Sequence, residues 1–143
     1  MKPTHFRDLD VWQVAMSLAK AVYVLTAEMP TSERYGLSSQ LQRAAVSVPS
    51  NIAEGNARGS LREYLRFLSI ASGSVAEVQT QLLLIVDLGL VAEDAVESAM
   101  ALAERVSQML YRMKQSLRSN LDDAGSRVPG SGSRIREVSE EYV

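Results

Sequence analysis

The chain has 143 residues, 46% of them hydrophobic and 22% charged, which suits one globular domain and excludes a wholly disordered chain or a fibre. It has no Cys, so disulfides, thiolate nucleophiles, Cys-ligated zinc and iron–sulfur clusters are excluded, and His5 is its single His. The net charge is −2, but residues 34–66 carry five Arg against two Glu and residues 77–104 carry six acids and no base, which predicts local charged patches.

The first predicted helix runs from about Leu9 to Glu28, with Asp8 as its N-cap and Pro30 just beyond its end. Its apolar residues recur at spacings of three and four and form two faces. We expect the first face to be buried, and it consists of Leu9, Trp12, Met16, Ala19 and Tyr23. The second face consists of Val11, Ala15, Leu18, Val22 and Leu25. A helix that is apolar around most of its circumference must be covered on more than one side.

The second predicted helix runs from about Ser38 to Ala57 and contains a proline. Its core positions follow helical spacing and are Leu37, Leu41, Ala44, Val48 and Ile52. Pro49 lacks an N–H, and its ring crowds the carbonyl of Ala45, so we expect a kink there. The alternative is that the helix breaks in two at this proline.

The third predicted helix runs from Leu61 to about Leu88, opened by a Ser60/Glu63 capping box and ended by Gly89. Its apolar seam has a heptad spacing and comprises Leu61, Leu65, Leu68, Ser72, Val75, Gln79, Leu82 and Val86. Residues 82–86 are all aliphatic and sweep the whole helical circumference. One core cannot cover all of them, so the sequence predicts a contact between subunits there.

The fourth predicted helix runs from about Glu93 to Ser119, with Arg112, Lys114 and Arg118 near its end, where cations favour the helix dipole. The four helices and their short connectors predict an all-α fold, an antiparallel up-down-up-down four-helix bundle over residues 1–119. Residues 120–143 are rich in Gly, Ser and charge and are predicted to form a flexible C-terminal tail.

Signatures of catalysis are missing from the sequence. It has no glycine-rich phosphate-binding pattern, no G-x-S-x-G and no Glu-x-x-His pair, so we expect no enzyme activity, no catalytic residues, no cofactor and no metal. It has no signal-peptide pattern, and its longest strongly apolar stretch, residues 82–92, is too short to cross a bilayer. We therefore expect a cytoplasmic protein without membrane contact.

The remaining functional signal is a set of arginines. Arg58, Arg62 and Arg66 are spaced by four, and Arg43 precedes them on the second predicted helix. Arg binds phosphate oxygens in a bidentate manner, so these four residues are candidate contacts for RNA or an acidic partner. The alternative is that this face is solvated or makes salt bridges between subunits. Within the chain, Glu54 can pair with Arg58 and Glu63 with Arg66.

Candidate positions for contacts between subunits are large apolar and aromatic residues. They are Trp12, Tyr64, Phe67, Leu83 and Ile85.

Several blocks over residues 6–118 carry a family resemblance. They are Phe6-x-x-Leu9-x-Val11-Trp12-Gln13, Tyr35-Gly36-Leu37-x-Ser39-Gln40, Arg43-Ala44-Ala45-Val46-Ser47-Val48-Pro49-Ser50-Asn51-Ile52-Ala53-Glu54-Gly55 and Glu63-Tyr64-x-Arg66-Phe67-Leu68. The chain resembles the bacterial 23S rRNA intervening-sequence proteins, a four-helix-bundle family also called S23 ribosomal proteins. Some members are encoded in inserts within large-subunit ribosomal RNA genes.

The resemblance implies a homo-oligomer, with a five-fold ring known among relatives, and no established enzymatic activity. Our first hypothesis is a non-enzymatic scaffold or adaptor that binds RNA or an RNA-processing partner. The alternative follows from a more distant similarity to the accessory protein of diversity-generating retroelements, a basic pentamer that binds a reverse transcriptase and nucleic acid. The isoelectric point of about 5.4 departs from that basic relative.

Overall fold

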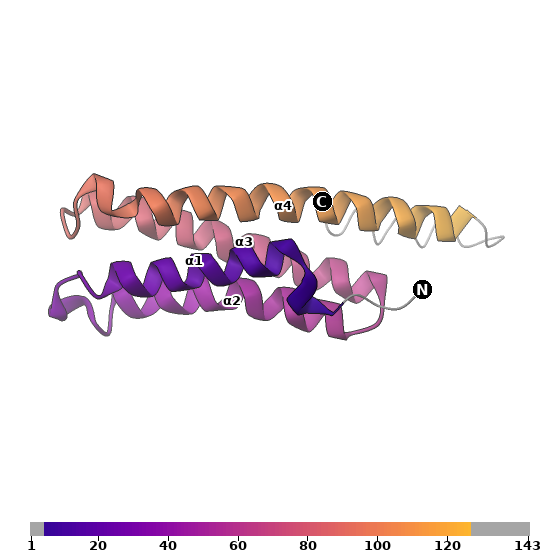
Figure 1. The fold of residues 1–143 in the computed structure, drawn as a ribbon, viewed down its shortest axis with the longest axis horizontal. Coiled ribbons are helices and arrows are strands. Elements are labelled where there is room, and N and C mark those ends of the chain that lie inside the picture. The colour runs from indigo at the N-terminus through magenta and orange to yellow at the C-terminus, as the bar shows by residue number, and fades with distance from the viewer. Residues whose placement is uncertain (1–4, 127–143) are drawn as a thin grey trace.

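The computed structural model describes residues 5–126, with side chains described as far as residue 123. This part of the chain is all-α, with four long helices and no strand: α1 (Asp10–Thr26), α2 (Leu37–Ala57), α3 (Leu61–Asp87) and α4 (Glu97–Ser126). Short 3-10 turns precede α1, α2 and α4, at Phe6–Asp8, Thr31–Glu33 and Glu93–Val96. The helices lie side by side in an elongated bundle, and α4 extends past the others at one end (Figure 1).

The start of α1 differs from the sequence prediction. Its N-cap is Leu9, whose side chain makes no capping bond, so the predicted N-cap Asp8 is wrong. Asp8 instead closes the 3-10 turn, where its N–H donates to the His5 carbonyl at 3.0 Å. A residue held in that turn cannot also adopt the extended backbone of an N-cap. The helix ends at Thr26, four residues before Pro30, as a following proline favours.

Helix α2 runs unbroken through Pro49, so the alternative of two separate helices is wrong. The Pro49 side chain is buried. Burial of the pyrrolidine ring recovers hydrophobic free energy that offsets the hydrogen bond missing at the Ala45 carbonyl. Tertiary packing therefore holds the helix together at a residue that intrinsic propensity disfavours.

Both ends of α3 follow the predicted local chemistry. The Ser60 hydroxyl accepts from the N–H of Glu63 at 3.2 Å and caps the first turn. At the other end Gly89 adopts a φ of 70°, the Gly89 N–H donates to the Val86 carbonyl, and the Leu90 N–H donates to the Ile85 carbonyl. This pair of bonds is a Schellman motif, which needs a left-handed residue and favours glycine.

Helix α4 is longer than predicted, because it continues to Ser126 instead of ending near Ser119. The cations Arg112, Lys114 and Arg118 are therefore not in its last turn, and their predicted role at the helix terminus is wrong. Residues 120–126 of the predicted flexible tail are helical. The rest of that tail, residues 127–143, lies outside the described residues.

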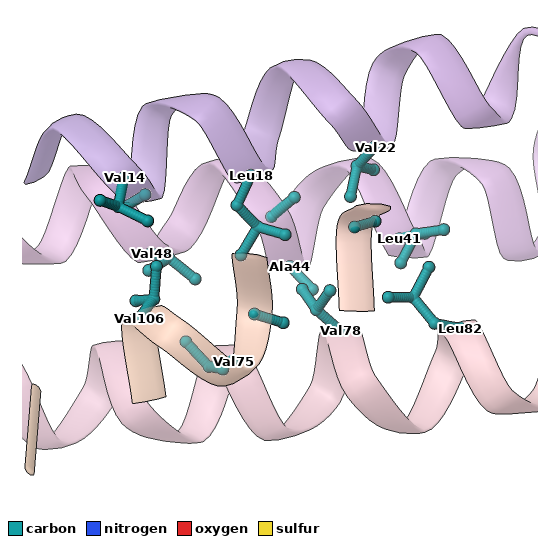
Figure 2. Packing of buried hydrophobic residues seen from close by; sticks show 14 of the residues in the cluster. Val14, Leu18, Val22, Leu41, Ala44, Val48, Val75, Val78, Leu82 and Val106 are labelled. Atoms are coloured by element: carbon teal, nitrogen blue, oxygen red, sulfur yellow. The ribbon is translucent and has the colours of Figure 1, made fainter. Parts of the chain in front are cut away.

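The core is a continuous aliphatic cluster contributed by all four helices (Figure 2). In α1 it is the second apolar face that is buried, including Val11, Leu18 and Val22. The first face is only partly covered within the chain, because Trp12 packs against the edge of the core while Tyr23 is 52% exposed, so the prediction that this face is buried holds only in part. Two apolar faces look alike in the sequence, and only the position of the neighbouring helices decides between them.

The buried seam of α3 departs from the predicted heptad. It contains Leu65, Leu68, Val75 and Leu82 as expected, but Ala71, Val78 and Ile85 replace Ser72, Gln79 and Val86. From Leu68 on, the buried residues still repeat every seven positions. The second series, which starts at Ala71, follows the first by three residues instead of the predicted four, so the buried seam is shifted by one residue at every second core position.

Each helix packs against the next along the chain, and α1 also packs against α4, which encloses the core. The contact between α2 and α3 is the most extensive of these. Within residues 5–126, α3 is the one helix that is long and apolar enough to cross a bilayer by length and composition, a criterion that core helices also meet. Of the apolar 18-residue stretch of α3 that meets this criterion, only 33% is buried inside the chain.

Candidate nucleic-acid interface

The short connection between α2 and α3 brings the end of one helix beside the start of the next. Arg58 follows the last residue of α2, Gly59 adopts a φ of 74°, and Ser60 caps α3. Only glycine adopts this left-handed conformation without strain. A chain reversal over residues 58–60 therefore places Arg58 beside the predicted arginines of α3, at one corner of the bundle.

A glycine sets how closely the two helices approach at this corner. A Cβ built on Gly55 would lie 2.8 Å from the Cβ of Phe67 and 3.1 Å from Cδ1 of Tyr64. The Asn56 amide Nδ2 donates to the Tyr64 hydroxyl across the same contact at 3.3 Å. Burial raises the pKa of the Tyr64 phenol, and the bond from Asn56 partly offsets this. Tyr64 and Phe67 are thus fixed against α2.

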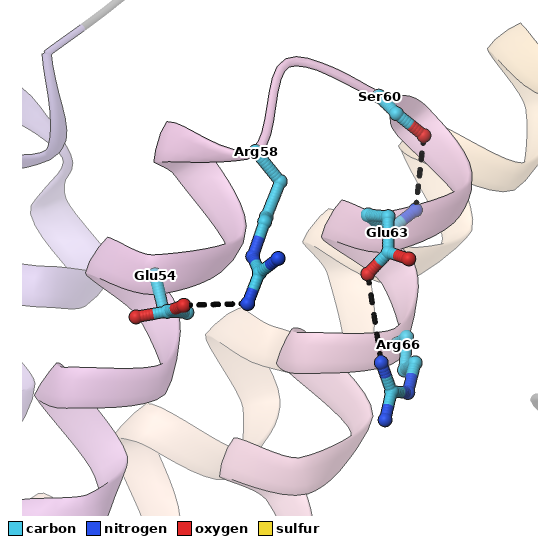
Figure 3. Close-up of polar contacts among 5 residues, drawn as sticks. All are labelled: Glu54, Arg58, Ser60, Glu63 and Arg66. Atoms are coloured by element: carbon cyan, nitrogen blue, oxygen red, sulfur yellow. Dashed lines mark hydrogen bonds and ion pairs between the residues drawn. The ribbon is translucent and has the colours of Figure 1, made fainter.

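The guanidinium groups of Arg58 and Arg66 both lie over the ring of Phe67, with Cζ at 4.9 and 5.6 Å from the ring centroid. Each is also paired with a carboxylate of its own helix (Figure 3). The Arg58 Nη2 donates to Oε1 of Glu54 at 2.7 Å, and Arg66 Nη1 lies 3.6 Å from Oε2 of Glu63. Both pairs anticipated from the i,i+4 and i,i+3 spacings are confirmed.

Both pairs remain open to solvent. The side chains of Arg58 and Glu54 are 49% and 51% exposed, and those of Arg66 and Glu63 are 55% and 42% exposed. Exposed pairs of this kind contribute little to stability, so the arginines can exchange one anion for another. The Oε2 atom of Glu63 is itself buried and has no hydrogen bond among the described residues, which marks this pair as the looser of the two.

The other two predicted arginines behave differently. Arg62 is exposed on α3, one turn before Arg66, and makes no bond or ring contact within the described residues. Arg43 lies roughly 22 Å along α2 from Arg58, at ~1.5 Å rise per residue. Its Nη2 donates to the Ser39 hydroxyl at 3.3 Å. The structure therefore brings together three of the four candidates, Arg58, Arg62 and Arg66, and leaves Arg43 apart.

Sequence reasoning missed the part that Phe67 plays in this cluster. Phe67 was a candidate for contacts between subunits, whereas the structure places it as the surface on which two guanidinium groups rest. Cation–π contact holds a guanidinium in place while leaving its N–H donors free. The available signal was the i,i+1 neighbour Arg66, but the contact with Arg58 crosses the connection and cannot be seen in spacing alone.

The predicted residues for contacts between subunits also divide. Leu83 is 58% exposed, and Trp12, Tyr64 and Phe67 are partly exposed. Ile85 is 0% exposed within the core of the single chain, so it cannot contact another copy and its prediction is wrong. Three other large apolar residues that the prediction did not name are exposed instead: Ile70, Leu84 and Leu88.

No group of three or more metal-ligating side chains occurs within the described part of the chain. The corner instead offers guanidinium donors on a fixed aromatic support, a chemistry suited to binding phosphate or carboxylate oxygens.

A family model matches residues 7–112, which span α1, α2, α3 and the first half of α4. The chain belongs to the 23S rRNA-intervening sequence protein family. The resemblance found in the sequence is thereby confirmed, together with the four-helix architecture. The match to this family includes the whole arginine corner, from Glu54 to Phe67. No curated protein is a match for this chain.

Proposed function

We propose that this member of the family is a non-enzymatic, self-associating helical scaffold that binds the phosphate backbone of RNA through Arg58, Arg62 and Arg66. The observation that carries the proposal is the gathering of three exposed guanidinium groups at one corner. Arg is well suited to phosphate, because its planar fork offers parallel donors and stays charged at all physiological pH values. The family description, which refers to 23S ribosomal RNA, favours RNA over an acidic protein.

Self-association is supported by the apolar side chains that α3 leaves uncovered. Ile70, Leu83, Leu84 and Leu88 are each at least 40% exposed. Large apolar side chains exposed together along one helix are typical of contacts between proteins. We propose a ring of five copies built from antiparallel up-down-up-down bundles, in which neighbours cover these residues. The short connectors and the packing of successive helices support the antiparallel order.

The RNA contact is tested with the double variant Arg62→Gln/Arg66→Gln. Binding to single-stranded RNA should weaken, and the slope of log affinity against log salt should flatten by about 0.7 for each phosphate that the variant no longer neutralises. The exposed pair Arg105→Gln/Arg112→Gln on α4 removes the same charge elsewhere and is the matched control. An equal loss of affinity in both double variants, or no loss in either, would contradict a contact at this corner.

The assembly is tested by the mass in solution of the wild type and of Leu83→Gln/Leu84→Gln. We expect an oligomer for the wild type and a smaller species for the variant, with unchanged helical content. Ala101→Gln, at an exposed apolar position on α4, should leave the mass unchanged. A wild-type monomer at micromolar concentration would refute self-association.

A further inference from the structure

We propose that Glu54 and Glu63 are internal competitors for the phosphates that bind Arg58 and Arg66, so that the RNA surface is partly masked in the free protein. This inference rests on the proposed RNA binding. It adds a regulation of that same surface: the carboxylates pair with the two guanidinium groups until a phosphate displaces them. Masking follows in three steps from where the arginines are held, what pairs with them and which arginine is left open.

The first step is that the carboxylates are not needed to position the arginines. Phe67 lies beneath both guanidinium groups, at 4.9 Å for Arg58 and 5.6 Å for Arg66. The Phe67 Cβ lies against Gly55 of α2, which holds the base of this side chain at the contact between the two helices. Cation–π contacts of this geometry persist without an ion pair. When a carboxylate is removed, its arginine therefore stays over Phe67 and becomes free to bind another anion.

The second step is that each carboxylate lies where a phosphate would bind: Glu54 occupies a donor of Arg58, and Glu63 pairs with Arg66 by charge without a hydrogen bond. Oε1 of Glu54 lies 2.7 Å from Arg58 Nη2, a short charge-assisted hydrogen bond. Oε2 of Glu63 lies 3.6 Å from Arg66 Nη1, with no hydrogen bond of its own among the described residues. Each carboxylate also repels an approaching phosphate. Because both pairs are about half exposed, they compete with a phosphate without excluding it.

The third step is the contrast with Arg62. This residue is exposed and makes no bond or ring contact within the described residues, so no carboxylate competes for it. Arg62 is therefore the first contact of the free protein with RNA, and Arg58 and Arg66 follow as their carboxylates are displaced. The free surface then presents one open arginine and two masked ones.

The test compares Glu54→Gln/Glu63→Gln with the wild type in binding a fluorescent oligouridylate at low ionic strength. We expect about three- to fivefold tighter binding, from the removal of two weak pairs of the i,i+3 and i,i+4 type. The matched control is Glu97→Gln/Glu104→Gln, which removes the same charge from exposed positions of α4. The first turn of α4 lies at the opposite end of the bundle from the α2–α3 connection (Figure 1). Helical content and mass should match the wild type in both variants.

The outcomes separate the inference from the proposed function. Tighter binding by Glu54→Gln/Glu63→Gln (the corner variant), but not by the control variant, supports masking. If the corner variant binds RNA and the wild type does not, masking is still supported, but the proposal that the unaltered chain binds RNA fails. Equal tightening by both variants overturns masking, since net charge then explains the gain. Unchanged or weaker binding by the corner variant overturns it as well, while RNA binding stands if the wild type binds. If neither the wild type nor the corner variant binds, both ideas fail.

A second measurement uses the order of the three contacts. In the wild type Arg62→Gln should weaken binding more than Arg58→Gln, because Arg58 is already occupied. In the Glu54→Gln/Glu63→Gln background the two substitutions should weaken binding equally. Equal effects in both backgrounds would overturn the inference.

Discussion

Gly55 of α2 and Phe67 of α3 lie in direct contact, so close that a Cβ on Gly55 would stand 2.8 Å from the Phe67 Cβ. This approach lets α2 and α3 meet at the arginine corner and holds the Phe67 ring beneath Arg58 and Arg66. A glycine at this position of α2 thus connects the packing of the bundle with the placement of the arginine corner.

Gly55→Ala should destabilise the protein, although alanine is the better helix former. The added Cβ would overlap Phe67 and Tyr64, and overpacking of this kind costs about 1–3 kcal/mol. Gly73→Ala is the control, because a Cβ at this α3 position meets nothing within 4 Å and should stabilise by about 0.5–1 kcal/mol. Denaturant unfolding measures both. A neutral or stabilising Gly55→Ala would contradict the close approach.

Two neighbouring aliphatic residues of α3 should respond very differently to truncation. Ile85→Ala should cost about 2–5 kcal/mol, because Ile85 is 0% exposed and its removal leaves a cavity. Leu83→Ala, at 58% exposure, should change the stability of a single subunit by no more than about 0.5 kcal/mol. If neighbours cover Leu83, its cost should grow with protein concentration. Thermal unfolding at several protein concentrations tests both expectations. Equal losses of stability in the two variants would contradict the first, and a loss in Leu83→Ala that does not change with concentration would contradict the second.

A small polar network joins α2 and α3 at mid-length. The hydroxyls of Ser47 and Ser74 lie 2.8 Å apart, and Asn51 Nδ2 donates to the Ser47 hydroxyl at 2.9 Å. Ser74→Ala should lower the free energy of unfolding by about 1 kcal/mol. The double variant Ser47→Ala/Ser74→Ala should lower it by less than the sum of the two single variants, because the two hydroxyls are partners. Ser17→Ala, at an exposed hydroxyl on α1, should change little. Additive losses in a double-mutant cycle would contradict the coupling.

Lys114 should make stability depend on pH on the alkaline side. Burial lowers the pKa of its ammonium group, and the nearby charge of Arg118 lowers it further. Between this lowered pKa and the ordinary value of 10.5, the unfolded chain binds more protons, so stability should rise with pH. Lys114→Gln should remove that rise and increase the melting temperature at neutral pH by no more than about 2 °C.

The matched control for Lys114 is Arg112→Gln, which removes an exposed cation of the same helix. It should leave the alkaline rise in stability in place. Thermal melts across neutral and alkaline pH compare the two variants. A rise that survives in Lys114→Gln would show that another group causes it.

The sequence by itself determined the features that depend on nearby residues. The Ser60 cap, the Gly89 stop and the two Glu–Arg pairs were all predicted, because each joins residues within one or two helical turns. The four-helix architecture was predicted as well, since four apolar periodic segments with short connectors have few other ways to bury their faces. Family membership followed from the same residues.

Only the tertiary structure decided the features that depend on distant residues. Which apolar face of α1 is buried, where the α3 seam shifts by one residue, and why Ile85 is core while Leu83 is surface all depend on the positions of neighbouring helices. The same holds for the arginine corner. Spacing within one helix predicted the ion pairs, but Arg58 meets Phe67 across the α2–α3 connection, and only where a glycine allows the helices to touch.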